Sequence, residues 1–320
     1  MKKYINIQIF RIVSCMFVWL VHIGQLFDYD GIVRKVMDIG KYAPYMFFII
    51  SGFVVFYSNA ERENYNVKQY YINRFFRVMP LYYMVIFFYF VLHTYLLKDV
   101  PLDESGLGWL RYIFVLNQII PEDDIFWCNL GATWTISCFV LFYILFPIIK
   151  KWISNIYSSI ALWIVCILIC KITIGNIRIE PIYYLHYFVF GSVLYFAVNN
   201  KKEKLMLFFL LSCLLILLTL KKEAINYILC LFFGIIILST MGLSVKNAMI
   251  LKLVDVLDKY SYTLYLCHPV VHELCRYGVL PKVLPIVILC VIFLCLLAHE
   301  FYEKSMDTLY KRICGHTVVL

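Results

Sequence analysis

Apolar stretches of about twenty residues recur along the whole chain, and no other feature restricts its possible folds as strongly. The hydrocarbon core of a bilayer is roughly 30 Å thick, so a helix needs about 20 mostly apolar residues to cross it. Lipid offers the backbone no hydrogen-bond partners, which excludes irregular structure from such segments. We therefore predict an all-α fold, a polytopic transmembrane helical bundle with about ten membrane spans. The predicted spans are residues 4–27, 41–58, 76–97, 131–149, 156–174, 182–199, 204–220, 224–243, 260–277 and 283–303.

The composition supports residence in a lipid bilayer. Hydrophobic residues make up 63% of the chain and charged residues 15%, against roughly half and a quarter in soluble domains. No polar linker divides the apolar segments, so we expect one transmembrane domain at 1–304 and a short basic tail at 305–320. The net charge of +9 does not indicate nucleic-acid binding, because the basic residues flank apolar spans. Twelve cysteines without a CxxC pair give no sign of a metal site.

The distribution of Lys and Arg predicts the orientation. Ten spans place both termini on one side of the membrane, and that side carries 17 of the Lys and Arg residues while the other carries 11. Arg11 lies within the first span. Because cytoplasmic loops carry an excess of basic residues, we expect both termini in the cytoplasm and the protein in the inner (cytoplasmic) membrane of the cell.

Two ionisable residues lie inside the first predicted span, Arg11 and His22. Ionisable groups in a span are costly and mark functional sites by default. Eleven steps of about 100° return to within about 20° of the starting direction, so both residues lie on one helix face, about 16 Å apart along the axis. Histidine suits general-base chemistry because it exchanges a proton near neutral pH. The structural alternative is that Arg11 reaches the inner interface and His22 bonds a neighbouring helix.

A basic motif, RFFR, stands at the cytoplasmic entrance of the third predicted span. Its arginines, Arg74 and Arg77, are three residues apart and so share a helix face. Their planar guanidinium groups are suited to bidentate contacts with phosphate. The alternative is ordinary anchoring of a span by positive charge on its inner side.

Several motifs occur in the order in which a known family of membrane proteins has them. The first span has an arginine, ten residues and a histidine, and the third begins with RFFRVMP. Between them lies FFIISGFVV (47–55), and SYTLYLCHPVV (261–271) and HEFYEKSMDTL (299–309) follow near the end. Together, over nearly the whole chain, they resemble acyltransferase family 3, which acylates surface polysaccharides, lipopolysaccharide, nodulation factors and some small molecules.

The resemblance implies an O-acyltransferase with a cytoplasmic acyl-CoA, usually acetyl-CoA, as donor and a hydroxyl of a cell-surface or exported carbohydrate as acceptor. The catalytic residues would be His22 and Arg11. His22 would activate the hydroxyl, directly or through an acyl-enzyme relay, and Arg11 would steer the CoA or stabilise oxyanion charge. Arg74 and Arg77 would bind the CoA phosphates, and no metal is expected. An acyl group larger than acetyl, such as succinyl, is compatible with the same residues.

Three weaker candidates for substrate contacts are Trp134, Tyr265 and His268. Tyr265 and His268 belong to the matching segment near the end, and Trp134 could stack on a sugar or adenine. Each also has a structural interpretation, because tryptophan gathers at membrane interfaces and Tyr and His bond between helices. One position departs from the family: its W-S-L-x-x-E segment corresponds to Trp134–Phe139, so Phe139 replaces the acid. If the family's carboxylate orients a catalytic group or contacts the acceptor, this chain does so in another way or uses a different acceptor.

Two other functions fit part of the pattern. A transporter or flippase for a lipid-linked sugar would use Arg11 and His22 to bind or relay charge without covalent chemistry, but it leaves RFFR without a ligand. A purely structural partner of polysaccharide-assembly proteins would tolerate replacement of His22. The ordered set of motifs favours the acyltransferase, for which such assembly proteins are possible partners.

Overall fold

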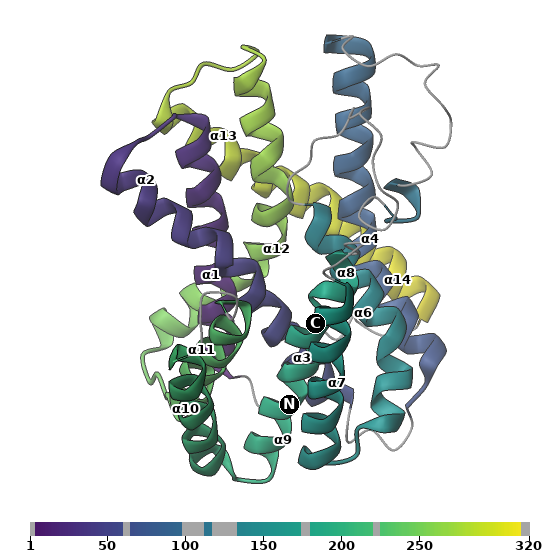
Figure 1. Cartoon of the computed structure of the whole chain (residues 1–320). Coiled ribbons are helices and arrows are strands. Elements are labelled where there is room, and N and C mark those ends of the chain that lie inside the picture. Colours follow the sequence, from purple (N-terminus) through teal and green to yellow (C-terminus); the bar gives the residue numbers. More distant parts are fainter. Residues whose placement is uncertain are drawn as a thin grey trace.

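The computed structural model describes residues 4–59, 65–97, 112–116, 133–173, 180–219 and 225–314. Every regular element in these ranges is a helix, which confirms the predicted all-α fold (Figure 1). In chain order the helices are α1 (Ile5–Leu26), α2 (Gly31–Asp38), α3 (Ala43–Asn59), α4 (Val67–Val91), α6 (Thr133–Trp152), α7 (Ile156–Thr173), α8 (Glu180–Tyr183), α9 (Leu185–Asn199), α10 (Glu203–Thr219), α11 (Ile225–Ser239), α12 (Ala248–Arg276), α13 (Leu284–Leu297) and α14 (Lys304–Cys314). A 3₁₀ turn, η1 (Ile39–Tyr42), and two π-helical turns, η2 (Leu92–Leu97) and η4 (Ala298–Glu303), connect or extend them.

Six helices in the described part are long and apolar enough to cross a membrane, fewer than the ten predicted. They are Ile5–Leu26, Gly31–Asn59, Val67–Leu96, Thr133–Trp152, Pro181–Asn199 and Leu284–Arg312. In the described residues, the other four predicted spans are mostly helical but differ in length or charge. The apolar parts of α7 and α11 are shorter, and α10 has 17 residues. The first half of α12 carries Lys252, Asp255, Asp258 and Lys259, which lower its hydropathy.

The outward faces of the helices are apolar. Phe87, Phe208, Leu289 and Phe293, which lie on α4, α10 and α13, are 63% to 70% exposed. Large apolar side chains gathered on an outer surface are costly in water but not among lipid tails, which are as apolar as the side chains themselves. The surface therefore supports a membrane location as strongly as the helix lengths do.

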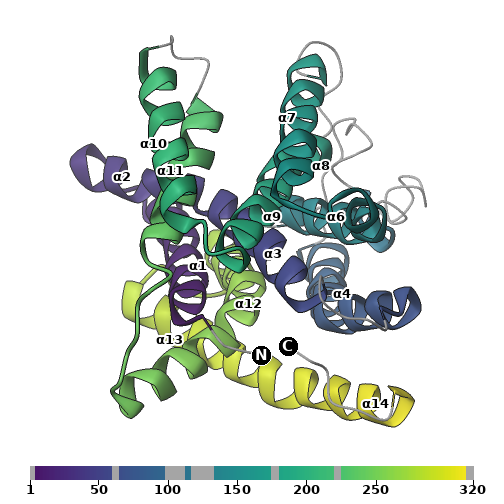
Figure 2. The same cartoon turned by 90° about the horizontal axis from the view of Figure 1, so that it is seen from below.

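The first helix packs in parallel against a helix from the end of the chain. Figures 1 and 2 both show α1 in purple beside α12 in light green. Cys15 Sγ donates to the Ser261 carbonyl at 3.1 Å, and Trp19 Nε1 donates to His272 Nε2 at 3.3 Å. Residue numbers rise together along the pair, so the two helices run in the same direction. This pairing places the first-span motif beside the SYTLYLCH segment.

A pair of glycines allows α3 and α9 to approach closely. A Cβ atom added at Gly52 would lie 1.9 Å from the Phe188 carbonyl oxygen, and one added at Gly191 would lie 2.3 Å from the Ile49 carbonyl oxygen. Any residue with a Cβ atom would collide with the neighbouring backbone at these two positions. Small residues commonly allow such close approach between membrane helices. The glycine of the FFIISGFVV segment is thus explained by backbone packing.

The helix that carries RFFR begins earlier than predicted. The Asn66 side chain caps α4 by accepting a hydrogen bond from the Gln69 backbone N–H at 3.2 Å. RFFR therefore lies inside the helix, which begins nine residues before the predicted span. Beyond it, Tyr262 donates to the Val78 carbonyl at 2.7 Å and Tyr302 to the Pro80 carbonyl at 2.6 Å. These bonds attach α4 to α12 and η4 around the proline.

Candidate functional site

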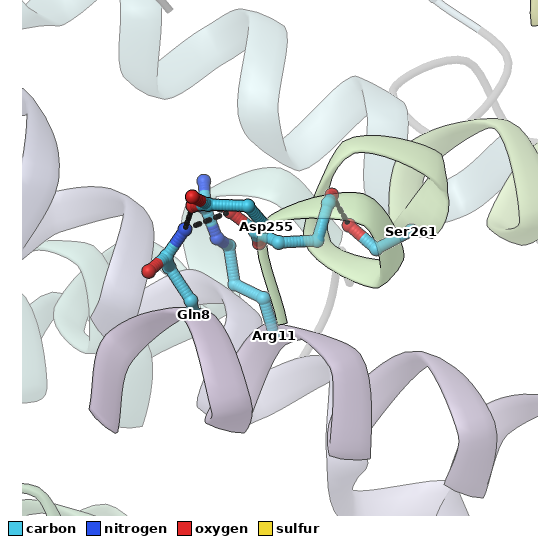
Figure 3. A network of polar contacts seen from close by, with 5 residues as sticks. Gln8, Arg11, Asp255 and Ser261 are labelled. Carbon is cyan, nitrogen blue, oxygen red and sulfur yellow. Dashed lines mark hydrogen bonds and ion pairs between the residues drawn. The ribbon is translucent and has the colours of Figure 1, made fainter. Parts of the chain in front are cut away.

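Arg11 forms an ion pair across the α1–α12 interface. Its Nη2 lies 2.5 Å from Asp258 Oδ2, and the two side chains are 23% and 11% exposed. Gln8 Nε2 donates to the same carboxylate oxygen at 3.2 Å and to Asp255 Oδ1 at 2.8 Å, and Figure 3 shows Gln8 and Arg11 extending from α1 toward Asp255 on α12. Partial burial makes this pair stronger than an exposed one, because water screens it less.

Arg74 and Arg77 of α4 adjoin this pair. Arg77 interacts electrostatically with Arg74, Arg11 and Asp258. The Arg74 guanidinium lies over two tyrosine rings, with its carbon 5.4 Å from the centroid of Tyr70 and 5.3 Å from that of Tyr143. We call Arg11, Arg74, Arg77 and Asp258 the arginine cluster.

The arginine cluster has the properties of an anion site. The cluster contains three arginines and one carboxylate, so positive charge is in excess within it. Within the described residues, the Nε atoms of Arg11 and Arg74 are buried and have no hydrogen-bond partner. Unpartnered guanidinium donors together with excess positive charge favour a phosphate or carboxylate ligand.

A second group of side chains lies further along the same two helices. The ring centroids of His22 and His268 are 5.2 Å apart, those of His268 and His272 5.6 Å, and those of His22 and His272 6.4 Å. We call these three residues the histidine cluster. His268 and His272 are 0% and 3% exposed, whereas His22 is partly exposed. His22 is therefore the member that a ligand reaches first.

The ring of His22 is held by its own helix. Its Nδ1 lies 2.9 Å from Gln25 Oε1. An amide oxygen only accepts, so Nδ1 carries the proton in this arrangement and Nε2 keeps its lone pair. No set of three His, Cys, Asp or Glu side chains in the described ranges has the geometry of a metal site.

Of the predicted substrate contacts, Tyr265 and His268 lie at the histidine cluster and Trp134 lies apart from it. The Tyr265 and Thr135 hydroxyls share a hydrogen bond at 2.8 Å, and the Tyr265 ring lies 6.2 Å from that of His268. Trp134, next to Thr135, instead packs against Tyr184 at 5.1 Å. Tyr265 and His268 thus join His22, and Trp134 contributes to a separate aromatic group.

Phe139, at the position where the family has an acid, belongs to that aromatic group. Its ring lies 5.3 Å from that of Phe48 and 5.4 Å from that of Phe188. A carboxylate among these rings would lose its hydration without gaining an ion-pair partner, which explains why an apolar residue fits here.

Sequence reasoning missed two polar residues of the clusters and a buried glutamate that follows one of them in the sequence. Asp258 pairs with Arg11, His272 belongs to the histidine cluster, and Glu273 is buried beside Arg276, with 3.3 Å between Glu273 Oε2 and Arg276 Nη1. The available signal was charge and histidine on one face of the SYTLYLCH helix. No spacing rule connects that face to a helix about 250 residues earlier.

Both clusters lie within the part of the chain that matches a known family. Residues 4–299 match the family model of an acyltransferase domain. The chain belongs to acyltransferase family 3. No curated protein and no solved structure gave a significant match. In this membrane acyltransferase, α1 and α12 contribute to both clusters, α4 adds two arginines to one of them, and Arg11 and His22 are about 16 Å apart along α1. The structure places Arg11 near Arg77, and His22 beside His268, which in turn contacts Tyr265. Their chemical roles remain predictions.

Proposed function

We propose that this acyltransferase transfers an acetyl group from cytoplasmic acetyl-CoA to a hydroxyl of a cell-surface or exported carbohydrate. The observation that supports this proposal is the arrangement of the two clusters along α1 and α12, with α4 contributing two arginines to one of them. Coenzyme A has phosphates at one end and a thioester at the other end of a long, thin arm. Phosphates bound at the arginine cluster would leave that arm free to reach along the helix pair toward His22.

Transfer then proceeds by general-base catalysis at His22. Its Nε2 takes the proton of the acceptor hydroxyl while the hydroxyl oxygen attacks the thioester carbonyl carbon. The C–S bond breaks, and the departing CoA sulfur takes the proton back from His22. Tyr265 and His268 contact the acceptor, and Arg74 and Arg77 hold the donor phosphates.

We further propose that both termini are cytoplasmic and that the protein lies in the inner membrane. The excess of Lys and Arg on that side supports this orientation. The same orientation turns the arginine cluster toward the cytoplasm, where acyl-CoA is made, and the histidine cluster toward the outer side, where exported carbohydrate and its assembly proteins are.

The test is mass spectrometry of surface carbohydrate from cells with the gene, without it, and with His22→Ala. We expect one acetyl group per modified unit to be lost in the deletion strain and in the variant, because the hydroxyl then lacks a positioned base. In membranes, His22→Ala should lower kcat about 10²- to 10⁴-fold and change the KM for acetyl-CoA little.

The amount of His22→Ala protein in membranes is measured by immunoblot as the control. Acetylation at the wild-type level in this variant would refute the role of His22. Carbohydrate with the same mass in the presence and absence of the gene would refute acetyl transfer as a whole, and carbohydrate that is only displaced between compartments would indicate a flippase.

A further inference from the structure

The histidine cluster contains two buried ring nitrogens that nothing in the described part of the chain satisfies. They are His268 Nε2 and His272 Nδ1. Their side chains are 0% and 3% exposed, so bulk water does not replace the missing partners. Buried polar atoms are normally paired, and an unpaired one costs stability. Such atoms beside a reactive residue mark a place where a ligand completes the bonding.

The bonds that these histidines do make fix the position of each proton. His268 Nδ1 lies 2.9 Å from the Leu264 carbonyl oxygen, which only accepts, so Nδ1 is protonated and Nε2 is an acceptor. His272 Nε2 lies 3.3 Å from Trp19 Nε1, which only donates, so this Nε2 is an acceptor and Nδ1 of the neutral ring is a donor. The two unpartnered atoms are therefore one acceptor and one donor.

We infer that His268 and His272 form a recognition pair for a second hydroxyl of the acceptor, next to the hydroxyl that His22 activates. A hydroxyl both donates and accepts, so it can donate to His268 Nε2 while it accepts from His272 Nδ1. The centroids of the two rings are 5.6 Å apart, and both lie within 6.4 Å of that of His22. The ligand class is thus a vicinal diol, as on a sugar ring. This inference rests on the proposed function.

Trp19 is the positioning residue of this pair. It lies on α1, is 7% exposed, and donates to His272. Because an indole N–H has no acceptor capacity, this bond excludes the tautomer in which His272 Nε2 carries the proton. α1 thus supplies the base and also sets the proton position of the residue opposite it.

Asparagine and glutamine separate the two nitrogens of each ring in an experiment. The amide of Asn lies near Nδ1 of the histidine that it replaces, and the amide of Gln lies near Nε2. His272→Asn keeps a donor toward the acceptor sugar, whereas His272→Gln keeps only the bond to Trp19. At position 268 the order is reversed, because His268→Gln keeps the acceptor atom and His268→Asn keeps only the bond to Leu264.

Each variant is expressed in the gene-deletion strain, and alkali-labile acetate per surface carbohydrate is measured at equal amounts of membrane protein. We expect His272→Asn and His268→Gln to retain most acetylation, and His272→Gln and His268→Asn to lose about tenfold, the effect of one lost hydrogen bond of ordinary strength. Melting temperatures of the four purified variants in detergent are measured in parallel.

The opposite order, with His272→Gln and His268→Asn active, would overturn the inference, because the bonds to Trp19 and Leu264 would then be the important ones. Equal activity or equal loss in all four variants would also overturn it, as would a loss of acetylation that follows melting temperature. If cells with the wild-type gene carry no more acetate than the deletion strain, the proposed function itself fails.

Discussion

Asp258 holds Arg11 in the arginine cluster and also cancels part of the positive charge there. In Asp258→Asn the amide oxygen can still accept a hydrogen bond from Arg11, but the negative charge is gone. We expect the KM for acyl-CoA to fall about three- to tenfold, or about 0.7–1.4 kcal/mol, because the cluster then attracts phosphate more strongly. The measurement is donor saturation in membranes.

Asp255→Asn is the matched control for this change. Asp255 lies one turn before Asp258 on α12 and accepts a hydrogen bond from Gln8 of α1. Its side chain is exposed, so water screens its charge. We expect less than about a twofold change in KM. A higher KM in Asp258→Asn would show instead that the carboxylate serves mainly to position Arg11.

Arg77 and Arg74 should each contribute directly to donor binding. We expect Arg77→Ala and Arg74→Ala to weaken acyl-CoA binding about ten- to hundredfold, because a charge-assisted bond to phosphate is worth about 1.5–3 kcal/mol. Binding of radiolabelled acetyl-CoA to membranes measures this. Arg34→Ala is the control, since Arg34 pairs with Asp38 on α2, outside the cluster. Unchanged affinity in both cluster variants would remove the donor site from α4.

At the scale of single residues, the sequence identified candidate residues inside one span but did not identify the residues that they contact. Arg11 and His22 could be singled out because an ionisable side chain in an apolar run is costly. Their partners Asp258 and His272 could not, because contacts between helices distant in sequence depend on the packing of the whole bundle.

At the scale of the element, α14 fixes the helix that carries Arg74. Tyr310 is 1% exposed, its hydroxyl accepts from Gln69 Nε2 at 2.9 Å and donates to Asn73 Oδ1, and its ring packs edge-on against Phe76. α14 thus holds in place the turn of α4 that precedes Arg74. The predicted basic tail therefore also contributes a packing and hydrogen-bonding contact to α4.

Tyr310→Phe should loosen this contact while the ring keeps its packing. We expect the free energy of unfolding to fall by about 1 kcal/mol and the KM for acyl-CoA to rise about threefold, with kcat nearly unchanged. Thermal melting and donor saturation measure the two effects. Thr308→Ala, on the exposed side of α14, should change neither. A fall in kcat without a change in KM would contradict a role limited to the donor side.

In the described residues, each of the ten segments predicted from hydropathy lies mainly on a helix, since burial and lipid exposure both select apolar residues. Hydropathy could not give the limits of the helices. α4 starts nine residues before the predicted span because its cap is a polar residue, Asn66. The first half of α12 is charged and mostly exposed, and Asp255 and Asp258 bond to α1. Hydropathy reports neither polar helix caps nor contacts between helices that are distant in sequence.

At the scale of the whole molecule, the orientation can be tested with reporters. Tags at residues 2 and 320 should report the cytoplasm, and tags at 103 and 123 the outer side, because of the 17 to 11 asymmetry in Lys and Arg. These four positions lie outside the described residues. Labelling of single cysteines by an impermeant thiol reagent gives the same information without a fusion. An external C-terminus would mean an odd number of spans.

The parallel pairing of α1 with α12 has a consequence for how the protein is made. Arg11 is synthesised well before its partner Asp258, which is 247 residues further along the chain. Until the ribosome has produced α12, the nascent chain carries an uncompensated charge and an unpaired histidine face in lipid. The arginine and histidine clusters are therefore completed only after α12 has been synthesised.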